Sequence, residues 1–136
     1  MQRVNSSELG IEPIKGDRNC CTVLAWAAVF GCNVDKADKY LRRFGRKWRK
    51  GMLTYEIEDA LKHCKRYKVV KGPYSSKKRV TLKRFTQEHS VGRYYVLVRG
   101  HALAVIDGVV VDHTDKPRRQ VTGAYRVYSP QEVTSD

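Results

Sequence analysis

The chain has 136 residues, of which 41% are hydrophobic, and its formal net charge is +13. This length suits one domain with a real core and is short for two. No stretch reaches the roughly 20 apolar residues of a membrane-spanning helix, and residues 1–10 lack the apolar run of a signal peptide. We therefore expect a single domain over 1–136, in the cytoplasm and without a membrane partner. The positive charge favours anionic partners and says nothing about the fold.

An apolar helix is predicted over about 20–30, where nearly every face is apolar and the helix must therefore be buried. Gly31 suits the left-handed position that ends such a helix. Small residues recur at helical spacing at Cys21, Ala25 and Ala28. They would allow a sheet to approach the helix closely beside the Cys21 thiol.

The other expected elements follow from turn residues, capping residues and apolar periodicity. They are an N-terminal arm over 1–15, a helix that starts after Asn33 or Asp35 and ends at Gly45, a helix capped by Thr54 that runs to about Tyr67, a short strand within 68–78, a helix over 82–89 capped by Thr81, strands over 93–99, 102–106, 109–112 and 124–128, a basic turn over 116–119, and a frayed tail over 129–136.

Asp107-Gly108 lies between two apolar runs and is the favoured two-residue turn of a β-hairpin. With this turn, strand alternation places His101 and Asp112 on the same face, at a distance that the carboxylate can span. An acid at the end of a valine run is out of place in a packed strand, which favours a functional interpretation of Asp112. His113 is expected on the opposite face.

Cys21 opens the buried helix, where the helix dipole and the free backbone N–H groups favour a thiolate. A cysteine, a histidine and an acid in this chain order are the parts of a thiol hydrolase. Cys21 would attack a carbonyl, His101 would move the proton, and Asp112 would orient the imidazole. The backbone N–H of Cys21 and a second donor would bind the oxyanion, and Asn19 is the nearest polar candidate. The structural alternative is a buried thiol, a histidine at a strand end and an acid next to a turn.

The four cysteines, Cys20, Cys21, Cys32 and Cys64, are expected to be free thiols. Adjacent cysteines are poorly placed to bridge each other, and no secretory context supports a disulfide framework. Cys32, His63 and Cys64 could supply zinc ligands, but the chain has no Cys-x-x-Cys pair of the kind that structural zinc sites use. We expect no metal and no other cofactor.

A basic segment with one tryptophan lies between the second and third predicted helices. Cations around an aromatic ring can bind single-stranded nucleic acid, although a solvated basic turn is the simpler interpretation. The candidate nucleic-acid contacts are Arg42, Arg43, Arg46, Lys47, Trp48, Arg49 and Lys50, with Lys77, Lys78 and Arg79 beside them.

Three segments taken together, Cys21–Gly31, Lys50-Gly51 and Gly92–Asp112, resemble small papain-like cysteine peptidase-type proteins of phages and bacteria. Cys20 stands where similar proteins have Asp, and the Gln that often precedes the nucleophile is missing. The resemblance implies an α+β papain-like fold, with the N-terminal cysteine-bearing helix packed on a C-terminal antiparallel β-sheet. The helix-then-strand order of the predicted elements agrees with this arrangement.

The same resemblance implies a hydrolase that uses Cys21, His101 and Asp112 to cleave a peptide or isopeptide bond in a protein. The net charge favours a substrate with an acidic surface, and a phage-encoded chain would act on a target in the host cytoplasm. Acyl transfer uses the same three residues and is not separated from hydrolysis by sequence. The other alternative is a basic, non-catalytic binding module on this scaffold that binds nucleic acid or a host protein.

Overall fold

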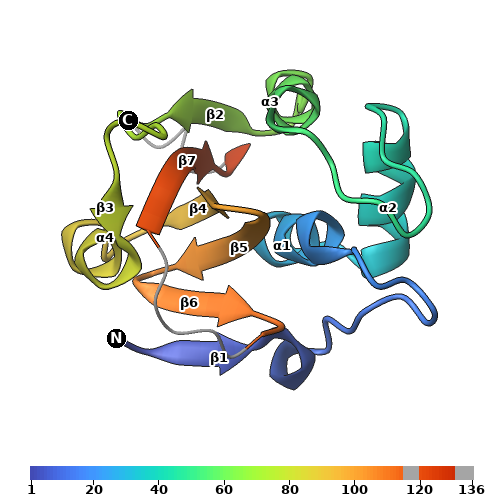
Figure 1. Ribbon diagram of the computed structural model, residues 1–136, viewed down its shortest axis with the longest axis horizontal. Coiled ribbons are helices and arrows are strands. Elements are labelled where there is room, and N and C mark those ends of the chain that lie inside the picture. The colour runs from blue at the N-terminus through green and yellow to red at the C-terminus, as the bar shows by residue number, and fades with distance from the viewer. Residues whose placement is uncertain (115–119, 131–136) are drawn as a thin grey trace.

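The computed structural model describes residues 1–114 and 120–130, which form an α+β fold of four α-helices and one seven-stranded sheet (Figure 1). The helices are α1 (Cys21–Phe30), α2 (Val34–Arg42), α3 (Thr54–Lys62) and α4 (Leu82–Glu88), and Ser6–Leu9 forms a 3₁₀ helix. The strands are β1 (Arg3–Asn5), β2 (Lys68–Lys71), β3 (Val80–Thr81), β4 (Arg93–Val98), β5 (His101–Ile106), β6 (Val109–Asp112) and β7 (Gln120–Tyr128). The basic turn predicted over 116–119 and most of the predicted tail over 129–136 lie outside the described residues.

The sheet has the order β1-β6-β5-β4-β7-β2, and β3 pairs with β7 (Figure 1). All of these pairings are antiparallel except that of β1, which lies parallel to β6 with Arg3 opposite Val110. The N-terminal arm expected over 1–15 thus contains a strand at Arg3–Asn5 that the sequence did not indicate. A strand of three residues is too short to show alternation, and its partner lies far away in the sequence.

The two faces of the sheet are covered by different helices, with α1 on one face and α4 on the other. Tyr95 and Leu97 of β4 belong to the apolar cluster around α1, while Val96 and Val98 belong to the cluster around α4. This alternation is the period-2 pattern of a strand that is buried on both faces. None of the helices within the described residues is long and apolar enough to cross a bilayer.

Helix α1 matches its prediction in extent and burial, because every residue from Thr22 to Phe30 is buried. Gly31 ends it with φ of 64°, the left-handed conformation that glycine adopts without strain. Strand β4 holds the helix at both ends. The Tyr95 hydroxyl donates to the carbonyl of Thr22 at 2.9 Å, and the Arg93 guanidinium donates to carbonyls at the C-terminal end of α1.

The predicted hairpin is confirmed. Ile106 lies opposite Val109, and both turn residues have positive φ, 49° at Asp107 and 78° at Gly108. Positive φ at both central positions is the signature of the type I′ turn, whose twist matches that of the flanking strands. The turn fixes the register of β5 and β6, and with it the relative positions of His101 and Asp112.

Several predicted boundaries differ from the structure. Helix α2 ends at Arg42 and not at Gly45, and α3 ends at Lys62 and not near Tyr67. Thr54 is the first residue of α3, and the cap position is taken by Leu53. The N–H of Leu53 donates to the carboxylate of Glu56 at 2.8 Å. Strand β7 begins at Gln120 and not at Ala124. Thr81 caps α4 as predicted, since its hydroxyl accepts the N–H of Arg84 at 3.2 Å.

Candidate active site

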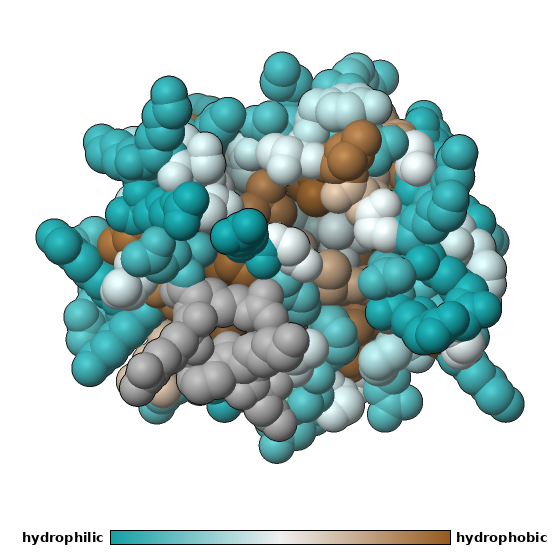
Figure 2. Space-filling view, in the orientation of Figure 1, coloured by the Kyte–Doolittle hydropathy of each residue, from teal (hydrophilic) through white to brown (hydrophobic). Residues whose placement is uncertain are grey.

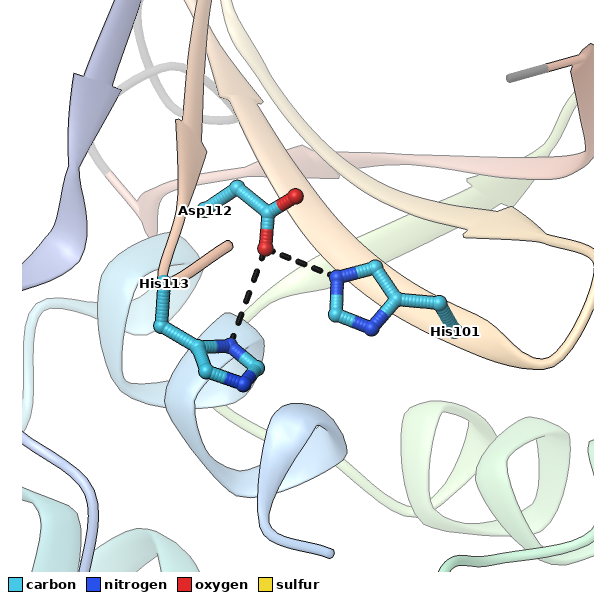
Figure 3. A group of neighbouring side chains, drawn as sticks. All are labelled: His101, Asp112 and His113. Carbon is cyan, nitrogen blue, oxygen red and sulfur yellow. Dashed lines mark hydrogen bonds and ion pairs between the residues drawn. The ribbon is translucent and has the colours of Figure 1, made fainter. Parts of the chain in front are cut away.

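The structure brings Cys21, His101 and Asp112 together from three elements. Cys21 is the first residue of α1, His101 begins β5, and Asp112 ends β6. The Nε2 atom of His101 lies 2.7 Å from Oδ1 of Asp112 (Figure 3). The other ring nitrogen, Nδ1, is then left for Cys21, whose sulfur has a hydrogen bond with the His101 side chain. The three side chains thus form a chain of hydrogen bonds that can pass a proton from the thiol to the imidazole.

The surroundings of Cys21 favour its thiolate. Burial raises the pKa of the Cys21 thiol, but the hydrogen bond and charge of His101 and the backbone N–H groups of Ala102 and Thr22 more than offset burial. The pKa therefore lies below its ordinary value of 9.0. The small residues predicted to admit a sheet do so, since Ala25 of α1 and Ala102 of β5 lie together beside the thiol.

For His101, burial and the neighbouring negative groups shift the pKa in the opposite directions to those at Cys21. Burial alone would lower the pKa of its imidazole, but the hydrogen bonds and negative charges of Asp112 and Cys21 raise it from 6.5 to about 9. With this raised pKa the imidazole of His101 is protonated at neutral pH, and it loses its proton as the pH rises through about 9. The pair of Cys21 and His101 is therefore a thiolate and an imidazolium over a pH range that ends near 9.

Asp112 is held by more groups than the sequence indicates. Its side chain is 1% exposed, and Oδ2 accepts a hydrogen bond from the Arg3 guanidinium at 2.8 Å and from the Thr114 hydroxyl at 3.1 Å. Arg3 also donates to the carbonyl of Thr114 at 2.8 Å. Burial raises the pKa of Asp112, but the hydrogen bond and charge of His101, followed by Thr114, outweigh it and lower the pKa below 3.8. The carboxylate is thus ionised and held in one orientation by both of its oxygens.

Replacing Arg3 with glutamine is expected to slow alkylation of Cys21 by iodoacetamide at neutral pH by about tenfold. The substitution removes a positive charge and one of the two donors to Oδ2 of Asp112, so His101 is held less firmly and the pKa of Cys21 moves back toward its ordinary value. The rate of labelling at Cys21, followed by mass spectrometry across a pH series, measures this shift. Arg84→Gln is the matched control, because it breaks an exposed ion pair with Glu88 on α4, which covers the opposite face of the sheet.

His113 lies beside the other two residues, and the prediction that it points away is wrong (Figure 3). Its Nδ1 atom lies 3.6 Å from Oδ1 of Asp112, and its ring centroid lies 5.4 Å from that of His101. Strand β6 ends at Asp112, so strand alternation no longer applies to the next residue. Asp112, His101 and His113 have the residue types of a metal site. The Arg3 guanidinium on Asp112 disfavours a second cation there.

Asn19 lies two positions before Cys21, and its side-chain amide donates to the carbonyl of Arg49 at 2.7 Å. Asn19 is the candidate second donor to the oxyanion, and one N–H of its amide is therefore already bonded to Arg49. The same bond joins the loop before α1 to the basic segment between α2 and α3. Arg49 has φ of 61°, a left-handed conformation that a residue with a side chain adopts only when its surroundings hold it there.

Arg46 is buried, and the prediction that it contributes to a nucleic-acid surface is wrong. Its side chain is 0% exposed and forms an ion pair with Asp17, whose side chain is also 0% exposed, and a second ion pair with Asp38 at 2.9 Å. Asp17 in turn accepts the N–H of Asn19 at 3.1 Å. Arg46 thus fixes the loop that delivers the nucleophile.

A cavity of about 270 Å³ lies directly beside the thiol and the imidazole. Cys21 and His101 line it, together with Thr22, Gly51, Met52, Thr54, Ile57, Leu97, Val98, Arg99, Gly100, Ala102 and Thr122. Figure 2 shows apolar side chains in the middle of this view, ringed by hydrophilic ones. A larger cavity of about 720 Å³ lies beside the C-terminal end of α1, but neither Cys21 nor His101 lines it.

No protein-family model, curated protein sequence or solved structure matches this chain. The geometry of the site is therefore what supports a function. Sequence reasoning missed two groups, Arg3 and the buried pair of Asp17 and Arg46. No local pattern marks either, because each acts on a partner that only the fold brings near.

Proposed function

We propose that this chain is a papain-like thiol hydrolase that cleaves a peptide or isopeptide bond in a protein substrate. The observation that carries the proposal is the hydrogen-bonded series of Cys21, His101 and Asp112 at the mouth of a cavity. The nucleophile heads a buried helix, and the base and the acid lie on adjacent antiparallel strands against it. This is the arrangement that the resemblance to papain-like proteins implies.

The first half of the reaction forms a thioester. The Cys21 thiolate attacks the substrate carbonyl carbon, a C–S bond forms, and the carbonyl electron pair moves to the oxygen. The backbone N–H of Cys21, which has no acceptor within the helix, faces the developing oxyanion in this proposal, with Asn19 as the second donor. The C–N bond then breaks as the His101 imidazolium gives its proton to the leaving amine.

The second half regenerates the enzyme. Neutral His101 takes a proton from water, and the oxygen of that water attacks the thioester carbon. The C–S bond breaks, the acid product leaves, and the Cys21 thiolate and the imidazolium are restored. Acyl transfer differs only in that an amine takes the place of water. Asp112 stabilises the imidazolium throughout and keeps Nδ1 directed at the sulfur.

Selective alkylation of Cys21 tests this proposal without a known substrate. Burial raises the pKa of Cys20, Cys32 and Cys64, whereas the surroundings of Cys21 lower its pKa. At pH 7 we expect iodoacetamide to label Cys21 at least about tenfold faster than the other three thiols, because each unit of pKa changes the thiolate fraction about tenfold. Peptide mapping by mass spectrometry gives the four rates.

The variant His101→Gln is the informative control. Losing the imidazolium should return the pKa of Cys21 toward or above its ordinary value and remove most of its rate advantage at neutral pH. Equal, slow labelling of all four thiols in the unmodified chain would contradict an activated nucleophile.

A binding role for the basic segment is the second candidate, and the position of Trp48 favours it. Its side chain is 47% exposed, with one side against Gly16, and it lies among Lys47, Arg49 and Lys50. An exposed ring among cations suits an unpaired base and its phosphates. In that case affinity for single-stranded nucleic acid would fall steeply with salt and would not change on Cys21→Ala.

A further inference from the structure

The cavity beside Cys21 and His101 is lined by no acidic side chain among the described residues. Its apolar lining includes Met52, Ile57 and Leu97. Apart from the two reacting groups, Arg99 is the only charged side chain of the described residues that line it. A substrate that fills this cavity therefore lies against a residue that carries a positive charge.

Arg99 is placed there by the connection between β4 and β5. It lies two positions before His101 in a tight turn completed by Gly100, whose φ of 68° is left-handed. The Arg99 side chain is exposed and makes no hydrogen bond or ion pair with a described residue. Its five N–H donors are therefore free to bind a ligand.

Several acids of the described residues already have a cationic partner, and Glu56, which lies between the cavity residues Thr54 and Ile57, accepts the N–H of Leu53. The ion pairs are Asp17 with Arg46, Asp38 with Arg42 and Arg46, Glu58 with Lys71, and Asp112 with Arg3. By contrast, Lys47, Arg49 and Lys50 form no ion pair within the described part of the chain, and the carbonyl of Arg49 is bonded to Asn19 beside the nucleophile. Bases without an ion pair among the described residues thus precede both Gly51 and Gly100, which line the cavity.

We propose that Arg99 is a specificity-determining residue that binds a carboxylate side chain of the substrate beside the scissile bond, so that the substrates are acidic peptide segments. This inference rests on the proposed hydrolase function and names its substrate class. A guanidinium binds a carboxylate through two parallel N–H···O bonds, which fixes orientation as well as charge. The unpaired bases at 47–50 add attraction over a longer range, which speeds the encounter of substrate and site.

Affinity labels that react with Cys21 test this inference independently of turnover. Matched peptidyl chloromethyl ketones would carry Glu, Gln or Lys at one of the two positions next to the reactive ketone, and the rate of Cys21 alkylation would be measured for each. The Glu label is expected to react about tenfold faster than its Gln counterpart. In Arg99→Gln this ratio should fall to near one, and Arg99→Glu should prefer the Lys label.

Lys83→Glu is the matched control, because it changes the net charge by the same amount from an exposed position on α4, which covers the opposite face of the sheet. It should keep the ratio of the unmodified chain. A Glu-to-Gln ratio near one in the unmodified chain would overturn the inference. An equal loss of preference in Lys83→Glu and Arg99→Glu would also overturn it, because net charge alone would then explain the preference.

Hydrolysis of internally quenched peptides with the same Glu and Gln pairs separates the two proposals. Cleavage with no preference for Glu contradicts the role of Arg99 and leaves the hydrolase intact. A preference for the Glu label that depends on Arg99, with no cleavage of any peptide, contradicts the hydrolase and supports recognition of acidic segments at this cavity.

Discussion

Replacing Cys21 with alanine is expected to lower the rate of peptide cleavage by at least about 10³-fold while the fold survives. The substitution removes one sulfur atom from a half-buried position at the start of α1, so little packing is lost. Without the thiolate no thioester forms, and His101 has no proton to receive. Cleavage of a mixed peptide library, read by mass spectrometry, measures the loss, and thermal unfolding followed by circular dichroism verifies the fold.

Cys20→Ala is the matched control, because it removes the same atom one position earlier. The Cys20 side chain is buried, and its thiol donates to the carbonyl of Asp17 at 3.7 Å. Cys20 does not line the cavity beside Cys21 and His101. This variant should keep most of the cleavage activity. Loss of activity in Cys20→Ala with retention in Cys21→Ala would reverse the assignment of the nucleophile.

Replacing Arg46 with methionine is expected to lower the free energy of unfolding by about 3–5 kcal/mol. Methionine keeps much of the side-chain volume but leaves the buried carboxylate of Asp17 without its partner. Burial raises the pKa of Asp17, and the hydrogen bond and charge of Arg46, with the N–H of Asn19, lower it below 3.8. The stability that the ionised Asp17 carboxylate contributes is fully present above pH 3.8. It is lost as the pH falls through the lower pKa that Asp17 has in the folded chain. Urea denaturation at neutral pH measures the change.

Lys47→Met controls for the loss of one positive charge in the same segment and should change the free energy of unfolding by less than about 0.5 kcal/mol. The double variant Asp17→Asn with Arg46→Met removes both charges and should recover part of the stability lost in Arg46→Met. If the single and double variants were equally unstable, the cost would come from lost packing and not from an unpaired carboxylate.

The parts of the fold that sequence predicts correctly depend on local patterns. Helix α1 is predicted because its apolar run and Gly31 lie within one continuous stretch. The β5–β6 hairpin is predicted because Asp107-Gly108 specifies both a turn type and a register. His101 is the first residue of the hairpin and Asp112 is its last, so the contact between base and acid follows from the same turn signal.

The parts that sequence misses depend on contacts between distant residues. Arg3 resembles any exposed base in a polar stretch, and only the parallel pairing of β1 with β6 brings it to Asp112. Arg46 lies in a run of similar bases, and nothing local distinguishes the one that is buried from its exposed neighbours. Strand alternation predicts that His113 and Asp112 lie on opposite faces, but alternation holds only while the strand continues.

The parallel pairing of β1 with β6 also affects the time at which a working site exists. Arg3 and Asp112 are 109 positions apart, so during synthesis the strand that carries Arg3 emerges long before the strand it joins. Contacts between such distant segments form late, since loop closure must precede them. Helix α1 can place its thiol early, but the carboxylate that supports the imidazole gains the Arg3 guanidinium only when the sheet is nearly complete. A partly made chain would therefore hold the nucleophile without a firmly held base.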